Sequence, residues 1–180
     1  MSGEPPGRRG AAFFDRDGVL NRDVAYAHKP EQIEWITGAA EAVRLANEAG
    51  LVVVVVTNQS GVARGYFSEA DVQALHDWMT AQLAAQDARI DRFYYSPFHK
   101  TAVNDAYRVA DHPDRKPNPG MLLRAIKDFD IDPARSFLIG DQISDVLAGA
   151  RAGVASYRFH GKDLPGLVRQ AIAELGDQGG

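Results

Sequence analysis

Short apolar runs alternate with amphipathic segments along most of the chain. The run at 51–57, LVVVVVT, is apolar on both faces, as in a central strand of a parallel sheet covered by helices on either side. The segment at 37–50 instead carries apolar residues near helical spacing and ends at Gly50, a common helix stop. The pattern predicts strands at 11–14, 51–57, 91–96, 136–141 and 154–159, and helices at 37–50, 68–83, 119–130, 145–153 and 164–175.

This alternation of strands and helices, without a hairpin signature, predicts an α/β fold. We expect a doubly wound parallel sheet with helices on both faces, a three-layer α/β/α arrangement. No internal repeat or linker interrupts the pattern, so residues 1–180 are expected to form a single domain. The two ends, 1–10 and 176–180, are expected to be flexible.

Composition narrows the class of protein. Hydrophobic residues make up 45% of the chain and charged residues 24%, which are ordinary values for a globular domain. The net charge of -4 gives no electrostatic reason to expect nucleic acid or an anionic membrane as a partner. The chain has no cysteine, which excludes disulfides and thiolate metal sites and fits a reducing compartment. We therefore expect a cytoplasmic monomer without a membrane segment.

Polar residues follow three of the predicted strands, in FFDRDG (13–18), VVVTNQSG (54–61) and LIGDQISD (138–145). Because ligands bind beyond the carboxyl ends of parallel strands, these residues are expected to meet at one edge of the sheet. The polar residues concerned are Asp15, Asp17, Thr57, Asn58, Gln59, Asp141 and Asp145.

Carboxylates gathered in this way repel one another. A like-charged pair at about 4 Å costs on the order of 1 kcal/mol in water and about 4 kcal/mol at an effective dielectric near 20. A divalent cation removes that cost, and a site of oxygen ligands alone favours Mg²⁺. The alternative is that each aspartate is a turn residue or a helix N-cap, as Asp145 could be at the start of its predicted helix. Gly18 beside the first pair and Lys116 as a counter-charge favour the site for Asp15 and Asp17.

Four motifs, DRDGV (15–19), TN (57–58), RKPNPG (115–120) and GDQISD (140–145), resemble the ordered motifs of the haloacid dehalogenase (HAD) superfamily. The resemblance implies that Asp15 is a nucleophile that attacks phosphorus and becomes an aspartyl phosphate. It also implies that Asp17 is the general acid and base. Residues i and i+2 of extended backbone point the same way, so both aspartates are expected to face the substrate while Arg16 faces away.

The same resemblance assigns the other motif residues. Thr57 and the amides around Asn58 would bind the phosphoryl oxygens, and Lys116 would offset charge on them and on Asp15. Mg²⁺ would be held by Asp15, by the backbone carbonyl of Asp17 and by Asp141, with Asp145 either as a further ligand or behind these ligands. The implied activity is that of a Mg²⁺-dependent phosphatase.

The intervals between the motifs are too short for a large cap domain, so a capless fold with an open site is expected. The longer stretches around these motifs, at 15–50, 54–67, 94–100 and 114–123, are similar to those of the D-glycero-D-manno-heptose 1,7-bisphosphate 7-phosphatases. Those enzymes are capless, and the histidinol-phosphatases are their relatives. GVARG at 61–65 and Tyr26 favour the heptose branch. By this resemblance the substrate-binding residues are Asp23, Tyr26, Asn58, Gln59, Ser60, Arg64 and Arg115. Arg64 would reach a second phosphate, or else be a solvated loop arginine.

The sequence departs from that family at a zinc site. Most members hold a structural zinc with a Cys-x-His and a Cys-x-Cys, and the corresponding positions here are Ser96, Phe98, His112 and Asp114. We expect no zinc, although His99, His112 and Asp114 together offer possible ligands. The expected substrate is a small phosphorylated sugar, with histidinol phosphate or another small phosphomonoester as the alternative. A phosphate-binding module without turnover is disfavoured because all the motifs are complete.

Overall fold

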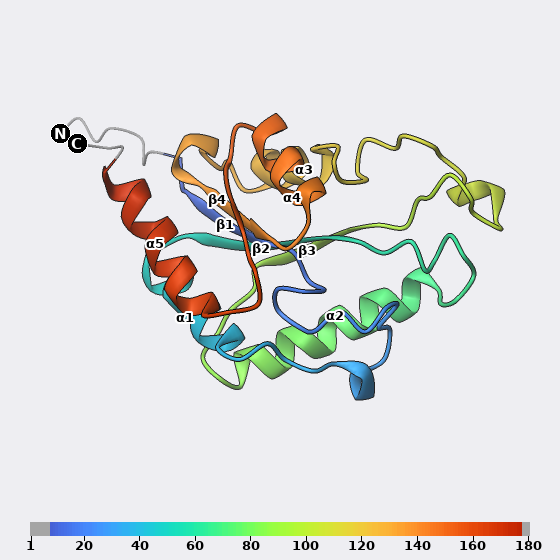
Figure 1. Cartoon of the computed structure of the whole chain (residues 1–180), viewed down its shortest axis with the longest axis horizontal. Helices are drawn as coiled ribbons and strands as arrows, with labels where there is room; N and C mark the ends of the chain where they lie inside the picture. The colour runs from blue at the N-terminus through green and yellow to red at the C-terminus, as the bar shows by residue number, and fades with distance from the viewer. Residues whose placement is uncertain (1–7, 178–180) are drawn as a thin grey trace.

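A computed structural model describes residues 8–177, which form a five-stranded parallel sheet in the order β3-β2-β1-β4-β5 (Figure 1). The strands are β1 (Ala11–Phe14), β2 (Val52–Asn58), β3 (Arg92–Ser96), β4 (Phe137–Gly140) and β5 (Ala155–Arg158). The helices are α1 (Ala39–Glu48), α2 (Glu69–Ala84), α3 (Gly120–Asp128), α4 (Ile143–Arg151) and α5 (Leu164–Asp177). Three single-turn 3-10 helices, η1 (Pro30–Gln32), η2 (Asp105–Tyr107) and η3 (Pro133–Arg135), lie in the connections and were not predicted.

The sheet has a hydrophobic core on each face. Successive side chains of a strand point to opposite faces, so Ala12 and Phe14 of β1 enter one core while Ala11 and Phe13 enter the other. Helices α1 and α5 pack on the first face, and α3 and α4 cover the second (Figure 1). This arrangement confirms the predicted three-layer α/β/α fold and explains why β1 is apolar throughout.

The local signals in the sequence placed the elements closely. Helix α2 begins after Ser68, whose Oγ accepts a hydrogen bond from the Asp71 amide while the Asp71 carboxylate accepts one from the Ser68 amide. Such a capping box satisfies two backbone donors that a helix start leaves free.

The flexibility predicted for the chain ends stays a prediction, and residues 1–7 and 178–180 lie outside the described range. Within it, Arg9 forms a β-bridge with Ile131, Gly10 is buried, and α5 continues to Asp177.

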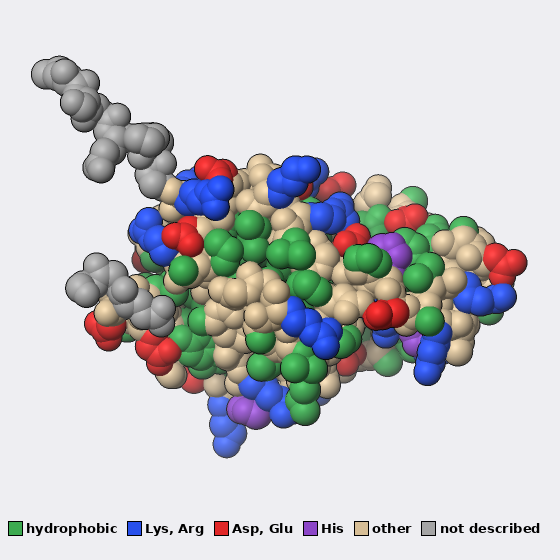
Figure 2. All heavy atoms as spheres, turned by 90° about the horizontal axis from the view of Figure 1, so that it is seen from above, with side chains coloured by type: hydrophobic (Ala, Val, Ile, Leu, Met, Phe, Trp, Pro, Cys, Tyr) green, Lys and Arg blue, Asp and Glu red, His purple; other side chains and the backbone are tan. Residues whose placement is uncertain are grey.

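The surface carries charges of both signs. On the face seen in Figure 2, acidic and basic side chains are interspersed with apolar ones. Among the described residues, no helix combines the length and the apolar character needed to cross a bilayer.

The register brings the loops after β1, β2 and β4 together. Phe14 is aligned with Val55 of β2 and with Ile139 of β4, and the Asp15 amide donates to the Ile139 carbonyl at 3.0 Å. The chain leaves β1 for β2 on one side and reaches β4 on the other, so β1 lies at the point where the strand order reverses. Open parallel sheets bind ligands at the carboxyl side of such a point.

Candidate active site

A cleft of about 330 Å³ opens at this edge of the sheet. The residues that line it are Asp15, Asp17, Asp23, Ala25, Tyr26, Thr57, Asn58, Gln59, Ser60, Lys116, Asp141, Gln142, Ser144 and Asp145. All residues predicted for the site are among them except Arg64 and Arg115. The strand-end residues therefore lie together at one edge of the sheet, as predicted.

Lys116 lies at the base of the cleft between two buried carboxylates. Its Nζ donates to Asp15 Oδ1 at 2.9 Å, to Asp145 Oδ1 at 2.5 Å and to the Val56 carbonyl at 2.8 Å. Burial lowers the pKa of Lys116, but the two carboxylates raise it by more, and the net pKa is raised. Lys116 is therefore a permanent positive charge in the site.

One lysine does not balance the negative charge around it. Burial raises the pKa of Asp15, the Lys116 charge lowers it, and Asp145 and Asp17 raise it again, so that the net pKa lies well above its ordinary value. The ionised form of Asp15 would be favoured by a further positive charge. A bound cation would supply that positive charge.

The acidic side chains fit a hard divalent cation. Asp15, Asp141 and Asp145 each present an oxygen, and these three atoms lie within 4.8 Å of one another. Asp141 Oδ1 is buried and has no hydrogen-bond partner among the described residues. An unpaired buried carboxylate oxygen beside two others is suited to Mg²⁺, which binds oxygen ligands. Asp145 also caps its helix, because Oδ2 accepts from the Gln142 amide at 3.0 Å. The capping alternative and the site are therefore compatible.

Gly18 allows the first motif to approach Asp141. Its φ is +87°, and a Cβ at this position would lie 2.2 Å from Asp141 Oδ2. Only glycine combines this backbone conformation with that space.

Asp17 lines the cleft, and neighbouring side chains bond both oxygens of its carboxylate. Oδ1 accepts from Arg16 Nε at 3.2 Å and from Asn21 Nδ2 at 2.9 Å. Oδ2 accepts from Arg16 Nη2 at 3.0 Å and from Gln59 Nε2 at 3.0 Å. The prediction that both aspartates face the cleft is correct. The expectation for Arg16 holds only in part, because its side chain stays out of the cleft and its guanidinium turns back to Asp17.

Arg16 itself is completely buried. Besides Asp17 it contacts the Ala27 carbonyl at 2.9 Å and Nε2 of His76, on α2, at 3.1 Å. No functional role was predicted for Arg16, Asn21 or His76. The only local signal is that Arg16 sits between the two motif aspartates, and nothing in the sequence around His76 indicates its contact with this site.

Asn58, the last residue of β2, and Gln59, which follows it, both hold other residues of the site in place. The Asn58 side chain bonds both the amide and the carbonyl of Lys116, at 3.0 and 3.1 Å, and so joins the second motif to the third. Gln59 was predicted to bind substrate and lines the cleft; its amide nitrogen donates to Asp17 and Thr57 and its oxygen accepts from Arg16. Its backbone amide donates to the Ser96 carbonyl. Gln59 is thus engaged by the protein and positions its neighbours.

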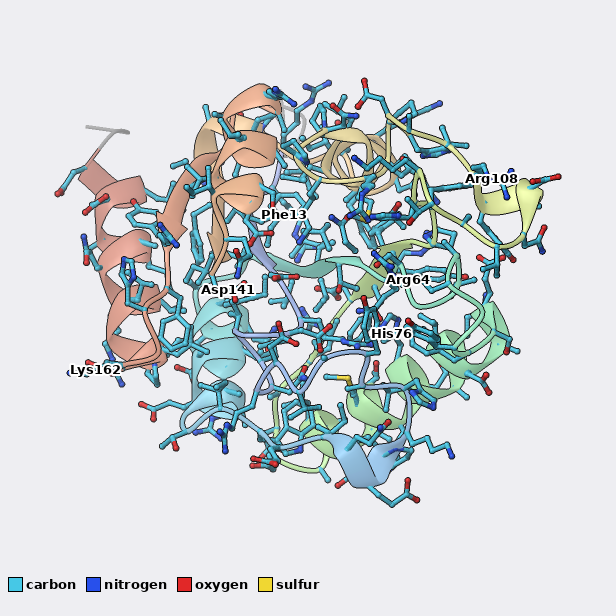
Figure 3. The ribbon with its side chains drawn as sticks, turned by 45° about the vertical axis from the view of Figure 1, so that its right-hand side comes forward. Phe13, Arg64, His76, Arg108, Asp141 and Lys162 are labelled. Carbon is cyan, nitrogen blue, oxygen red and sulfur yellow. The ribbon has the colours of Figure 1, made fainter. Side chains whose placement is uncertain are left out.

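Arg64 and Arg115 lie beside the cleft, on the side of Tyr26. The Arg64 guanidinium is 6.0 Å from the centre of the Tyr26 ring, and its buried Nε has no hydrogen-bond partner among the described residues. Figure 3 shows Arg64 apart from Asp141, toward the long loop whose outer end carries Arg108. Burial and the Arg64 charge lower the pKa of Arg115, whose Nη1 donates to the Phe98 carbonyl at 3.2 Å. Neither arginine forms a salt bridge within residues 8–177.

The loop at 97–114 is held by aromatic and polar contacts. The rings of Phe98 and His112 stack with centres 3.6 Å apart, and His112 Nδ1 accepts from the Asp114 amide at 3.0 Å. His99 Nδ1 lies 2.8 Å from Thr101 Oγ1. Within the described range, the only group of three or more potential metal ligands is the one at Asp15, Asp141 and Asp145. The expectation of no zinc stays a prediction.

Protonation of His76 should lower the unfolding free energy of the protein as the pH falls below about 6.5. Burial, and then the Arg16 charge, lower the pKa of His76 well below 6.5 in the folded state. The unfolded chain takes up this proton near pH 6.5, so the stabilising contribution is complete above that pH and is lost as pH falls toward the folded pKa. Urea titrations at pH 7.5 and pH 5 should show a loss of unfolding free energy, of up to about 1.4 kcal/mol per pH unit from this group. In His76→Gln this part of the loss should disappear, and an equal loss in both proteins would contradict the assignment.

A family model, curated relatives and solved structures all match this chain. A HAD-hydrolase-like family model matches residues 114–158. The D-glycero-beta-D-manno-heptose-1,7-bisphosphate 7-phosphatase of Rhodopseudomonas palustris is 50% identical over 169 residues, covering 93% of each chain. The D-glycero-alpha-D-manno-heptose-1,7-bisphosphate 7-phosphatase of Burkholderia mallei is 44% identical over 146 residues, covering 81% of this chain and 77% of its own.

A solved structure extends the likeness to three dimensions. The D,D-heptose 1,7-bisphosphate phosphatase of B. bronchiseptica, complexed with magnesium and phosphate, superposes with a TM-score of 0.78 at 30% identity. The match covers 92% of this chain and 99% of that one. Together with the motif residues gathered in the cleft, these relatives establish that the chain belongs to the D-glycero-D-manno-heptose-1,7-bisphosphate 7-phosphatase family of HAD-like phosphatases.

Proposed function

We propose that this protein is a Mg²⁺-dependent phosphatase that removes the C7 phosphate of D-glycero-D-manno-heptose 1,7-bisphosphate. The observation that carries the proposal is the cluster at the base of the cleft. There Lys116 joins Asp15 to Asp145 and leaves Asp141 Oδ1 buried and unpaired. A cleft of about 330 Å³ is large enough for one phosphorylated sugar end.

The reaction would proceed in two displacements. A carboxylate oxygen of Asp15 forms a bond to phosphorus while the bond from phosphorus to the C7 oxygen breaks, and its electron pair stays on the leaving oxygen. Asp17 donates a proton to that oxygen. Asp17 then takes a proton from a water molecule whose oxygen attacks phosphorus, and the aspartyl phosphate breaks to give inorganic phosphate and free Asp15.

The other residues would place charge where the phosphoryl group needs it. Lys116 offsets the charge on Asp15 and on the transferring group, and Thr57 donates to a phosphoryl oxygen. Mg²⁺, held by Asp15, Asp141, Asp145 and the Asp17 carbonyl, would neutralise charge on the phosphoryl oxygens when bound. Asp23, Tyr26 and Ser60 would contact the sugar from the walls of the cleft.

Arg64 and Arg115 would bind the second phosphate, at C1. They lie close enough for the Arg64 charge to lower the pKa of Arg115, and neither has a carboxylate partner within residues 8–177. Two adjacent guanidinium groups without a counter-charge suit a phosphate, which can accept from both. Tyr26, whose ring centre lies 6.0 Å from the Arg64 guanidinium, lines the cleft and would separate this position from Asp15.

A substrate panel tests the proposal. Phosphate release should be fastest from a heptose 1,7-bisphosphate, and the panel contains both anomers because the relatives differ in the anomer they are named for. Arg115→Ala should raise KM for the bisphosphate about 10-fold and leave KM for a sugar monophosphate unchanged. Faster turnover of histidinol phosphate would favour the alternative substrate, and no phosphate release from any compound would favour a binding module.

Activity should require added Mg²⁺. Treatment with EDTA should lower kcat by at least about 100-fold, since the metal supplies several kcal/mol of charge stabilisation, and Mg²⁺ should restore it. Elemental analysis of the purified protein should find no stoichiometric zinc. Activity that resists EDTA would contradict the first expectation, and one tightly held zinc per chain the second.

We also infer, from the charge and the absence of cysteine, that the protein works as a monomer in the cytoplasm. Size-exclusion chromatography with light scattering would test the first part, and fractionation of cells the second.

A further inference from the structure

We propose that Arg16 and His76 are positioning residues for the reaction: His76, on α2, fixes the buried Arg16 guanidinium, which in turn fixes the carboxylate of Asp17 toward the cleft. This inference rests on the proposed role of Asp17 as general acid and base. It adds two residues to the site: Arg16, which lies within the first motif, and His76, which lies on α2 outside every motif.

The first step is the grip on Asp17. Arg16 donates to both of its oxygens, through Nε and Nη2 to Oδ1 at 3.2 and 3.1 Å and through Nη2 to Oδ2 at 3.0 Å. Asn21 donates one further hydrogen bond to Oδ1 at 2.9 Å, and Gln59 donates one to Oδ2 at 3.0 Å. The side chain of Asp17 remains 22% exposed. The carboxylate is thus held at both oxygens while part of it still faces the cleft, which is the geometry that directed proton transfer requires.

The second step is the hold on Arg16. A guanidinium has only donors, so the contact of 3.1 Å between Nη1 and His76 Nε2 requires Nε2 to be the acceptor. His76 is therefore a neutral imidazole with its proton on Nδ1. The lowered pKa of His76 agrees with this form.

The third step is the fixation of the His76 ring. It stacks on Phe93 of β3, with centres 4.2 Å apart and planes at 18°, and meets the Tyr95 ring edge at 6.0 Å. Arg16 contacts it from the loop after β1, and Tyr95 faces it from β3. His76 is 95% buried in this setting, because its exposed fraction is 5%. The sheet and α2 thereby set the position of the guanidinium.

If Arg16 and His76 served only to stabilise the fold, Arg16 would not need the His76 ring nitrogen as an acceptor. A buried arginine that served only packing would be satisfied by Asp17 and the Ala27 carbonyl, and an apolar residue would fill the place of His76. The imidazole instead accepts from the Nη1 group that the carboxylate does not reach. If that acceptor is removed, Nη1 is left buried and unpaired, so the guanidinium should move toward another partner and carry the Asp17 carboxylate with it.

The experiment compares three variants of α2. His76→Phe keeps a ring on Phe93 but removes the acceptor, and His76→Gln keeps an acceptor, since its Oε1 can occupy the place of Nε2. Met79→Ala, one turn along, empties a fully buried site on the same helix and removes none of the hydrogen bonds of Arg16 or Asp17. It controls for destabilisation, which is about 2–5 kcal/mol for such a truncation. Each variant is assayed, as full chain with Mg²⁺, on a sugar phosphate and on p-nitrophenyl phosphate, whose leaving oxygen needs no proton.

His76→Phe should lower kcat for the sugar phosphate about 10- to 100-fold, as for a small misplacement of a reacting group, with KM little changed. The loss on the aryl phosphate should be several times smaller. His76→Gln should recover most of kcat, and Met79→Ala should lower the melting temperature while its folded fraction keeps wild-type rates on both substrates. In an Asp17→Asn background, His76→Phe should cause almost no further loss, because the two residues act as one unit.

Three results would overturn the inference: equal losses on the two substrates, no recovery in His76→Gln, or full additivity with Asp17→Asn. The proposed function is judged separately in the same set of proteins. If Asp17→Asn alone shows no dependence on the leaving group, the proposed role of Asp17 fails and the inference fails with it. If Asp17→Asn shows that dependence and His76→Phe does not, only the inference fails.

Discussion

Asp15→Asn should lower phosphate release by at least about 10⁵-fold, because loss of the attacking group of a covalent mechanism removes most of the catalysis. An amide oxygen is a far weaker nucleophile than a carboxylate, and a phosphorylated amide could not be formed and hydrolysed in the same way. Asparagine has nearly the same shape as aspartate. Its oxygen can still accept from Lys116 Nζ and from the Arg16 amide, which bond Oδ1 at 2.9 and 2.8 Å. The fold should therefore be retained.

The measurement has two parts. Steady-state phosphate release gives the rate, and acid quenching of a reaction with ³²P-labelled substrate should trap label on the wild-type chain but not on the variant. Asp132→Asn is a matched control, since Asp132 caps η3 through a side-chain oxygen that asparagine also has. Near-normal turnover by Asp15→Asn, or covalent label on that variant, would show that another residue is the nucleophile.

Asp17→Asn should lower kcat by roughly 10²–10⁴-fold, the usual contribution of general acid–base catalysis. Asparagine preserves the backbone carbonyl that would hold Mg²⁺ but cannot transfer a proton. The loss should be large for a sugar phosphate, whose alkoxide needs a proton. It should be smaller for p-nitrophenyl phosphate, as far as formation of the aspartyl phosphate limits the rate.

The structure also predicts how this variant affects stability. Arg16 is completely buried, and Asp17 is the carboxylate that it bonds through three contacts. Replacing hydrogen bonds to a charged group should lower the unfolding free energy by about 1.5–3 kcal/mol. A lower melting temperature is thus expected even if Asp17 is catalytic, and only the leaving-group comparison decides its role. Equal losses of kcat on both substrates would remove Asp17 from the chemistry.

The architecture and the meeting of the strand-end aspartates could be predicted from the sequence alone. Runs such as LVVVVVT are apolar on both faces only where helices cover both sides of a sheet, so the pattern was enough to predict the layers. The aspartates of the first and fourth motifs directly follow strands, and parallel strands bring such residues to one edge whatever the details of packing. The local pattern therefore predicted that Asp15, Asp17, Asp141 and Asp145 lie together.

The contacts of each side chain could not be predicted in this way. Gln59 lines the cleft as predicted, but its side-chain bonds to Arg16, Asp17 and Thr57 could not be read from the sequence. His76 reads in the sequence as one more residue on the buried face of α2, yet it accepts from a guanidinium that precedes it by 60 positions in the chain.

The same is true of the two arginines beside the cleft, Arg64 and Arg115, which come from different loops and approach each other only in the fold. The physical reason is common to these cases. Element type follows from local periodicity and backbone preference, whereas a buried donor or charge takes its partner from whatever segment the packing brings within about 3 Å. That choice is made between residues distant in sequence, so no local pattern contains it.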